Sequence, residues 1–207
     1  MKELIERLKA TSSQENHDAY QAELKTEHNE KIKKILTEIM DKKYINITWK
    51  DYTVESDNQD SFGKVKQWFT AYKQGSWLVL KGTHGTGKTM LKNILIKYLY
   101  GNHKIKAINT TLYGLYVEYL DSIKNGSTKR LLDRLGNAKL LVIDEIGRKE
   151  STTALKDFVF EVMDRLYLNG GSAILITNLE SVKEYIDISR LNEVGLSVTF
   201  SGKDRRK

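Results

Sequence analysis

The sequence predicts an α/β fold in which five parallel strands form one sheet that is covered by helices. Three observations support this prediction. From residue 77 onward, short apolar runs alternate with segments of helical periodicity. A glycine-rich loop at 82–89 separates the first apolar run from the first helical segment. A later apolar run, at 140–143, ends in two adjacent carboxylates, Asp144 and Glu145.

The predicted elements follow from the spacing of apolar residues. Strands are expected at 77–81, 105–108, 140–143, 173–176 and 196–200. Helices are expected at 88–100, 112–123 and 128–135, around Phe158–Leu166, and after a polar loop at 57–61 that leads into Phe62 and Val65. The run at 140–143 is apolar on both faces, as is usual for a central strand of a parallel sheet.

The first 45 residues are predicted to form a separate, highly charged helical arm. Within the arm, one narrow apolar stripe has helical spacing: Ile32, Ile35, Leu36, Ile39 and Met40. Such a stripe packs either on its own domain or on a partner protein. We therefore expect two parts, a partner-binding arm at 1–45 and a nucleotide-binding domain at 46–207.

Composition limits the classes of protein to which the chain can belong. Its 207 residues include no cysteine, which excludes disulfides and thiolate zinc sites and is compatible with a reducing cytosol. The N-terminus carries acidic residues and lacks the apolar core of a secretory signal. No apolar run approaches the roughly 18 residues that a membrane helix needs. We expect a cytoplasmic protein.

The positive charge is unevenly distributed along the chain. The net charge is +7, yet residues 1–45 contain nine basic and nine acidic residues, so the whole excess lies in 46–207. This excess is compatible with the binding of a polyanion in addition to a nucleotide. A surface that only promotes solubility is an equally good explanation.

The loop Gly82–Thr89 has the pattern G-x-x-x-x-G-K-[ST] of a phosphate-binding loop, or P-loop. Its glycines permit a tight turn in which backbone N–H groups point at an anion. Lys88 is expected to contact the β- and γ-phosphates of ATP, and Thr89 to hold Mg²⁺. The residues expected to contact the nucleotide are Gly82, Thr83, His84, Gly85, Thr86, Gly87, Lys88, Thr89 and Met90. The strand before the loop and the helix after it disfavour a chance match.

The carboxylates after the 140–143 run have the Walker B pattern. Asp144 is expected to hold the hydration shell of Mg²⁺ beside the P-loop. Glu145 is expected to orient or deprotonate the attacking water. An acidic loop after a core strand is the alternative, and the P-loop upstream disfavours it.

Two polar residues, Thr177 and Asn178, follow the predicted strand at 173–176. The amide of Asn178 is expected to lie near the γ-phosphate, which is the sensor-1 role in AAA+ ATPases. The alternative is that these two residues cap a helix that begins near Ser181.

Several motifs occur in the order that is found in one group of ATPases. They are Gly82–Thr89, Asp144–Gly147, Asp164–Tyr167, Ile176–Leu179, Ser189–Leu191 and Phe200–Arg206. Over about 46–207 the chain resembles the DnaC/DnaI helicase loaders and the related IstB transposition ATPases, which have an AAA+ fold. The resemblance implies catalytic roles for Glu145 and Asn178, and it implies that the usual all-α lid domain is missing.

Two arginines take their predicted roles only from this resemblance. It implies that Arg190 is an arginine finger, which reaches into the ATP site of a neighbouring subunit. It also implies that Arg206 is a sensor-2 arginine, with Arg205 as the alternative. Because a single subunit lacks the finger in its own site, weak ATPase activity alone and assembly into a ring or spiral with ATP are expected.

The resemblance also implies a partner, a DnaB-type replicative helicase that is bound by the N-terminal arm and placed on single-stranded DNA. The helix at 110–124 is expected to face that DNA, with Tyr113, Lys124 and Lys129 as contacts. Tyr116 and Tyr119 also fit the core face of this helix, and at least one is expected to be core. DnaI-type loaders carry a cysteine-rich zinc module, which this sequence does not contain.

Two other functions stay open at this stage. One is an IstB-like accessory ATPase that remodels DNA for a transposase, although the neutral arm favours a protein partner. The other is a nucleotide-binding adaptor without catalysis, against which Lys88, Asp144 and Glu145 argue.

Overall fold

The computed structural model describes residues 26–27, 29–147, 151–202 and 204. The chain divides into two compact units, Met1–Glu38 and Ile39–Lys207. In the first unit, residues 29–38 are helical, which confirms the predicted helix for that stretch. The second unit contains the P-loop and every other described residue of the predicted site.

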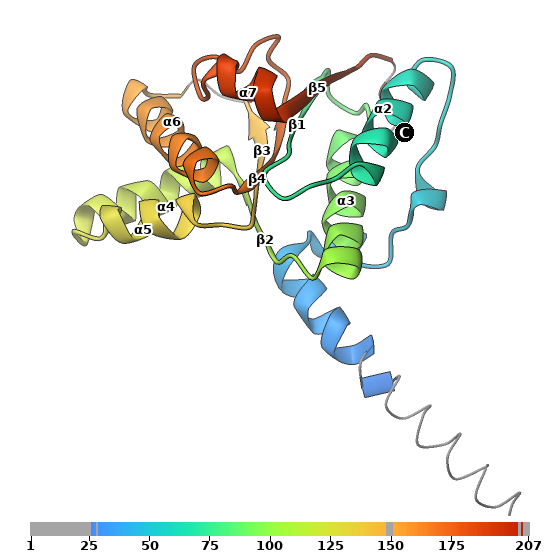
Figure 1. The fold of residues 1–207 in the computed structure, drawn as a ribbon, viewed down its shortest axis with the longest axis horizontal. Coiled ribbons are helices and arrows are strands. Elements are labelled where there is room, and N and C mark those ends of the chain that lie inside the picture. The colour runs from blue at the N-terminus through green and yellow to red at the C-terminus, as the bar shows by residue number, and fades with distance from the viewer. Residues whose placement is uncertain (1–25, 28, 148–150, 203, 205–207) are drawn as a thin grey trace, which may run out of the picture. The chain divides into compact units, whose positions relative to one another are not determined.

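The second unit is built on one five-stranded sheet (Figure 1). Its strands are β1 (Trp77–Gly82), β2 (Ala107–Thr111), β3 (Leu140–Ile146), β4 (Ser172–Thr177) and β5 (Gly195–Phe200). They lie in the order β2-β3-β4-β1-β5, and every neighbouring pair is parallel. The predicted parallel sheet is therefore confirmed. This order brings the carboxyl ends of β1, β3 and β4 together at one edge.

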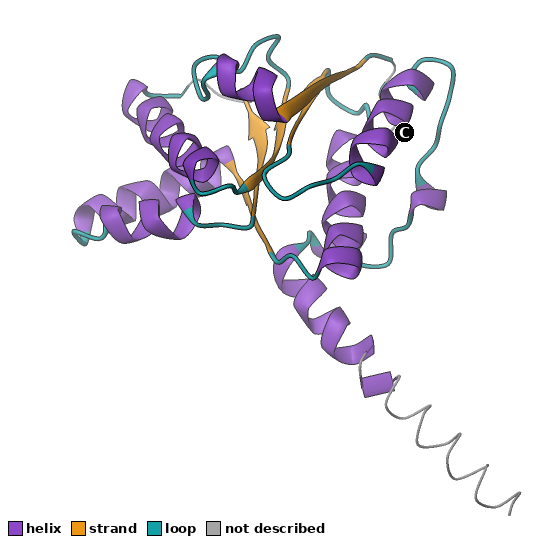
Figure 2. Ribbon diagram, in the orientation of Figure 1, coloured by secondary structure: helices purple, strands orange, loops and turns teal. Residues whose placement is uncertain are grey.

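Helices cover both faces of this sheet (Figure 2). They are α2 (Gln59–Thr70), α3 (Lys88–His103), α4 (Leu112–Lys124), α5 (Thr128–Gly136), α6 (Thr153–Leu168) and α7 (Ile188–Val194). Two short 3₁₀ helices, η1 (Lys42–Tyr44) and η2 (Trp49–Asp51), precede α2. In Figure 1, α2 and α3 lie on one side of the sheet, and α4, α5 and α6 lie on the other. Among the described helices, none has the length and apolar character needed to cross a membrane.

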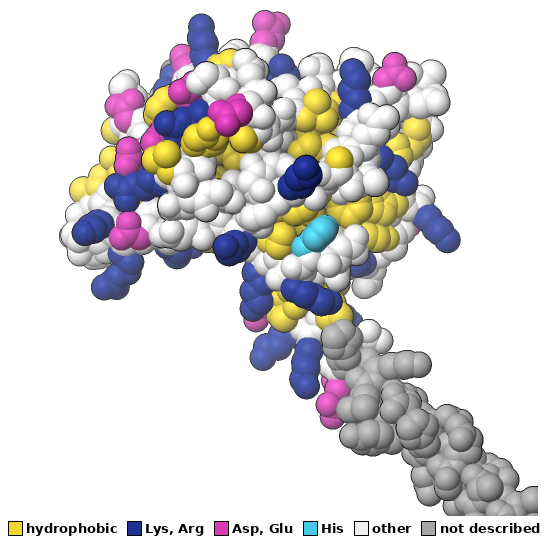
Figure 3. Space-filling view, viewed as in Figure 1, with side chains coloured by type: hydrophobic (Ala, Val, Ile, Leu, Met, Phe, Trp, Pro, Cys, Tyr) yellow, Lys and Arg dark blue, Asp and Glu magenta, His cyan; other side chains and the backbone are white. Residues whose placement is uncertain are grey.

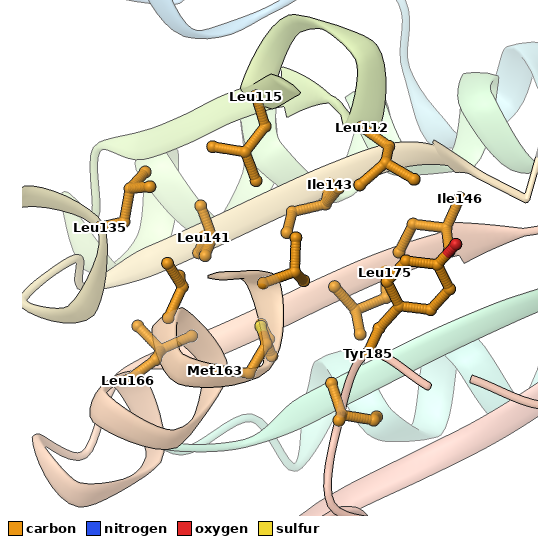
Figure 4. Packing of buried hydrophobic residues seen from close by; sticks show 14 of the residues in the cluster. Leu112, Leu115, Leu135, Leu141, Ile143, Ile146, Met163, Leu166, Leu175 and Tyr185 are labelled. Carbon is orange, nitrogen blue, oxygen red and sulfur yellow. The ribbon is translucent and has the colours of Figure 1, made fainter. Parts of the chain in front are cut away.

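The core between the sheet and helices α4 to α6 fixes the position of β3. Leu115, Leu135 and Leu166 project from the three helices onto Leu141 and Ile143 of β3, and all five are fully buried (Figure 4). Burial of a Leu or Ile side chain contributes about 1.5–3 kcal/mol. The strand that ends in the two carboxylates is therefore among the most firmly held parts of the fold.

Two predicted boundaries are wrong. The second strand begins at Ala107 and continues to Thr111, because its polar residues pair with β3 as far as Asp144. No helix begins near Ser181. The segment up to Asp187 forms turns, and α7 begins at Ile188, where Asp187 accepts a hydrogen bond from the Ser189 N–H at 2.8 Å.

Candidate functional site

A cavity of about 770 Å³ lies where the carboxyl ends of β1, β3 and β4 meet. The predicted residues that line it are His84 to Met90 of the P-loop segment, Asp144, Glu145 and Asn178. Small-molecule sites usually have volumes of roughly 300–1,000 Å³, so the cavity can enclose a nucleotide. The structure thus brings together three motifs that are far apart in the sequence.

The P-loop takes a backbone conformation that requires glycine at both ends. Gly82 has φ +135°, and a Cβ atom there would overlap the carbonyl oxygen of Phe200 on β5. Gly87 has φ +88° and stands at the N-cap of α3. The backbone N–H groups of the first turn of α3 are therefore directed at the cavity, as in anion sites at helix N-termini.

The side chain of Lys88 is held in place by hydrogen bonds to the P-loop. Its Nζ donates hydrogen bonds to the carbonyl oxygens of Gly82 (2.7 Å) and Thr83 (2.6 Å) and to the hydroxyl of Thr86 (3.2 Å). The side chain is buried. These hydrogen bonds fix the ammonium against the loop, which reduces the entropy lost when an anion binds.

Asp144 is buried at the end of β3, and both of its carboxylate oxygens have partners. Oδ1 accepts the N–H of Glu145 at 2.7 Å, and Oδ2 lies 3.1 Å from the Nζ of Lys92 on α3. This arrangement fixes the side chain in one orientation, toward the base of the cavity.

Glu145 has a strained backbone. Its φ of +61° lies in the left-handed region, which is unfavourable for a residue with a side chain. The strain coincides with a shift in the β3–β4 register between Ile143 and Ile146. Strain of this kind is concentrated at functional sites, where the surrounding structure holds it in place.

Asn178 reaches the cavity because the end of β4 is tied to the end of β3. The hydroxyl of Thr177 donates to the carbonyl of Ile146 (2.8 Å) and accepts the N–H of Leu179 (2.9 Å). The amide nitrogen of Asn178 lies 3.2 Å from a ring nitrogen of His84 in the P-loop. The alternative role, as a cap for a helix near Ser181, is wrong.

The segment before α2 also lines the cavity, and the sequence did not predict this. Tyr52 donates a hydrogen bond to the carbonyl of Thr86 (3.3 Å), and its ring stacks on Phe62 at a centroid distance of 5.0 Å. Other residues of this segment that line the cavity are Lys43, Tyr44, Asp51 and Thr53. The available signal was a group of apolar and aromatic residues in this short segment: Tyr44, Ile45, Ile47, Trp49 and Tyr52.

Two buried polar residues of α3, Lys92 and Asn93, were also missed. They stand one turn after Lys88 and Thr89, so helical spacing puts them directly behind the P-loop. Polar residues within the apolar run from Leu91 to Ile96 were a signal that could have identified them.

The oxygen donors in the cavity are compatible with Mg²⁺. The Thr89 hydroxyl and the Asp144 carboxylate both line it, and oxygen ligands are those that Mg²⁺ prefers. Among the described residues, no group of three or more His, Cys, Asp or Glu could hold a metal ion. Water and phosphate oxygens of a nucleotide would supply the further ligands of Mg²⁺.

Arg190 on α7 is not among the residues that line this cavity. Its guanidinium forms an ion pair with the carboxylate of Asp164, donates to the Asp164 carbonyl (3.2 Å) and stacks over the ring of Tyr167 at 4.8 Å. All these partners belong to α6 of the same chain. The other predicted arginine, Arg206, and its alternative Arg205 lie outside the described residues.

The predicted DNA contacts lie on exposed surface. Tyr113 is 63% exposed, and Lys124 and Lys129 are also exposed. Tyr113 and Lys124 stand about three helical turns apart on one face of α4. Val117 and Leu120 are exposed between them, so this face is more apolar than the sequence suggested.

The other two tyrosines of α4 have a structural role. Tyr116 and Tyr119 pack on the core, and Tyr119 stacks on Phe158 at 4.4 Å, so the prediction that at least one is core is confirmed. In the view of Figure 3, basic side chains of the described part of the second unit are scattered over the surface and do not form one continuous patch.

Curated relatives are found among proteins of DNA replication. The chain is 30% identical over 104 residues to the chromosomal replication initiator protein DnaA of Bacteroides thetaiotaomicron, which is 49% of this chain and 22% of that protein. It is 27% identical over 137 residues to the replicative helicase loader DnaC of Escherichia coli, which is 64% of this chain and 56% of that protein. The chain thus spans only part of these relatives.

A solved structure of the DnaC helicase loader has the same fold. It superposes with a TM-score of 0.66 at 17% identity and covers 78% of this chain and 100% of the other. The fold is therefore that of the AAA+ ATPases. The sequence profile described as "IstB-like ATP binding protein" matches residues 20–188, most of the chain. On this match, and with a P-loop cavity of the right size and composition, the chain belongs to the family of IstB-like ATP-binding proteins.

Proposed function

We propose that this protein is an ATP-dependent helicase loader. It binds a hexameric DnaB-type replicative helicase and assists its placement on single-stranded DNA when replication starts, in the cytoplasm. The observation that carries the proposal is the convergence of Lys88, Asp144 and Asn178 on one cavity, in a chain similar to replicative helicase loaders. ATP acts as a switch, because the different nucleotide states of the protein favour different assemblies.

Five of the residues that line the cavity have proposed roles in ATP hydrolysis: Lys88, Thr89, Asp144, Glu145 and Asn178. Lys88 and the N–H groups at the start of α3 hold the β- and γ-phosphates. Thr89 and Asp144 hold Mg²⁺, which when bound neutralises phosphate charge. Glu145 orients the attacking water or accepts its proton, and Asn178 donates a hydrogen bond near the γ-phosphate.

A neighbouring subunit is proposed to complete this site. Arg190 is bound to Asp164 and is not among the residues that line its own cavity, which supports a role as an arginine finger in trans. Such a cation stabilises charge on the transferring phosphoryl group, so the single subunit is a weak ATPase. Assembly into a ring or spiral with ATP follows from this role.

A second arginine is proposed to act within the subunit. Arg206 serves as sensor 2 at the nucleotide. The proposal is supported by Asp204, two residues earlier, because a Cβ atom added to Gly85 of the P-loop would overlap its carboxylate.

Single-stranded DNA is proposed to bind along α4 and the start of α5. Tyr113 offers an exposed ring for stacking, and Lys124 and Lys129 attract phosphates. The N-terminal arm, 1–45, is proposed to bind the helicase. Its equal numbers of basic and acidic residues suit a protein surface better than a nucleic acid.

A loading assay on circular single-stranded DNA tests the proposal, because a closed helicase ring cannot thread onto a circle. The full chain, a DnaB-type helicase and ATP are mixed with the circle, and DNA-bound helicase is measured after gel filtration. We expect the chain to increase that amount, and the Lys88→Ala variant to fail as the matched control. A chain that neither co-elutes with the helicase nor increases loading contradicts the proposal.

The family match favours a second candidate, an IstB-like accessory ATPase that remodels DNA for a transposase. Parallel gel filtration with a transposase and duplex DNA distinguishes the two. ATP-dependent co-elution with the transposase and duplex, without helicase binding, would replace the first proposal by the second.

A further inference from the structure

The ammonium of Lys92 is shared between two carboxylates. Its Nζ lies 3.1 Å from Oδ2 of Asp144 and 3.0 Å from Oδ2 of Asp41, and the side chain is only 3% exposed. A buried cation requires such partners, because an unpaired charge away from water is strongly unfavourable. One of these partners is the carboxylate proposed to hold Mg²⁺.

Asp41 has a second connection to the same site. The amide nitrogen of Asn93 donates to Oδ2 of Asp41 (2.8 Å) and to the carbonyl of Thr89 (2.9 Å), and the Asp41 N–H donates to Oδ1 of Asn93 (3.0 Å). Both proposed Mg²⁺-holding residues are therefore linked to Asp41, Thr89 through Asn93 and Asp144 through Lys92.

Asp41 is charged at neutral pH. Burial by itself would raise its pKa, but the hydrogen bond from Asn93 and the positive charge of Lys92 outweigh this and hold the pKa below its ordinary value. In the sequence, Asp41 comes three residues after Glu38, the last residue of the N-terminal unit. Asp41 also lies within residues 1–45, the arm proposed to bind the helicase, close to its C-terminal end.

We propose that Lys92 is a positioning residue that exchanges partners with the nucleotide state. Asp144 and Asp41 share it in the structure, and we expect it to pair with Asp41 alone when Mg²⁺ and nucleotide are bound. The physical reason is repulsion between Lys92 and a divalent cation that would share one carboxylate in a low-dielectric site. The inference rests on the proposed binding of Mg²⁺ and nucleotide, and it adds a link from that site to Asp41.

The proposal fixes the direction of two substitutions. Lys92→Met frees Asp144 from its competing cation, so less Mg²⁺ is needed for nucleotide binding. Asp41→Asn keeps the shape of the side chain but removes its charge, so Lys92 stays with Asp144 and more Mg²⁺ is needed. In the double variant, Asp41→Asn has no further effect, because its influence passes through Lys92.

Calorimetry of the full chain with a non-hydrolysable ATP analogue, over a series of Mg²⁺ concentrations, measures the Mg²⁺ midpoint without relying on activity. We expect Asp41→Asn to raise the midpoint about fivefold or more and Lys92→Met to lower it by a similar factor. Asp51→Asn is the matched control, because the Asp51 carboxylate lines the same cavity but accepts hydrogen bonds from Thr48, whereas Lys92 pairs with Asp41 and Asp144. Its midpoint should move less than that of Asp41→Asn.

Each result of the calorimetry either supports or overturns the inference. An unchanged or lowered midpoint in folded Asp41→Asn overturns it, as does an effect of Asp41→Asn that persists without Lys92. If Lys92→Met does not fold, the comparison of Asp41→Asn with Asp51→Asn decides. If the wild-type chain binds the analogue with a Mg²⁺ midpoint and Asp41→Asn leaves it unchanged, only this inference fails. If the wild-type chain takes up no nucleotide, the proposed function fails and the inference fails with it.

Discussion

Replacing Thr177 by valine tests how the end of β4 is held. The residue is 1% exposed, and its hydroxyl is bonded to the carbonyl of Ile146 and to the N–H of Leu179. Valine has nearly the same shape, so packing is preserved while both hydrogen bonds are lost. Each bond contributes about 0.5–1.5 kcal/mol, and a buried group left without a partner costs about 1–3 kcal/mol. Because the Leu179 N–H is only partly buried, we expect a loss of about 2–3 kcal/mol in the free energy of unfolding.

Urea unfolding followed by circular dichroism measures this loss from the shift of the midpoint at constant slope. Thr177→Ser is the matched control, because it keeps the hydroxyl and removes one methyl group, at a cost of about 1 kcal/mol. ATP turnover should fall in the valine variant more than nucleotide affinity does, since Asn178 directly follows the disrupted link. A valine variant as stable as the serine variant would refute the assignment of these hydrogen bonds.

Four further substitutions separate binding, chemistry and assembly. Lys88→Ala should abolish detectable binding of ATP by calorimetry, because the cavity loses the cation bonded to the P-loop; retained affinity contradicts the site. Glu145→Gln should keep that affinity and lower turnover by about 10²–10⁴-fold in a phosphate-release assay. Unchanged turnover would show that Glu145 does not act on the water. Arg190→Ala should lower turnover by about 10³-fold or more, but only at protein concentrations at which subunits assemble; an equal effect in the monomer excludes a role in trans. Asp164→Asn should increase turnover of the assembled protein, because Arg190 loses one of its two carboxylate partners and keeps only Asp187. Decreased turnover in that assay contradicts this.

The P-loop and the Walker B residues could be predicted because their chemistry depends on local sequence. The positive φ values of Gly82 and Gly87 and the overlap that a Cβ would create at Gly82 restrict these positions to glycine. The apolar run before Asp144 reflects burial of β3 on both faces. In such segments the local sequence and the tertiary fold favour the same structure, so pattern alone is informative.

The errors arose where tertiary contacts determine the structure. The end of β2 is polar, and it is a strand because β3 pairs with it, which its own sequence does not indicate. The partners of Lys92 could not be found from sequence, because Asp41 lies 51 residues earlier and reaches α3 only in the folded chain. Lys97 holds the same segment through the carbonyls of Ile45 and Ile47, each at 2.9 Å, and burial lowers its pKa.

Three charged groups of the predicted site have partners within the chain. Lys88 is bonded to loop carbonyls, Asp144 to Lys92, and Arg190 to Asp164. In the proposed mechanism, the contact of Asp144 competes with a divalent cation and that of Arg190 with a neighbour's site, whereas the contacts of Lys88 hold it in place for phosphate. The proposal therefore requires that two pairs exchange partners, that of Asp144 on nucleotide binding and that of Arg190 on assembly. Because each exchange depends on a different ligand, ATP hydrolysis by this protein should be limited to the assembled, nucleotide-bound state, which is the behaviour that a switch requires.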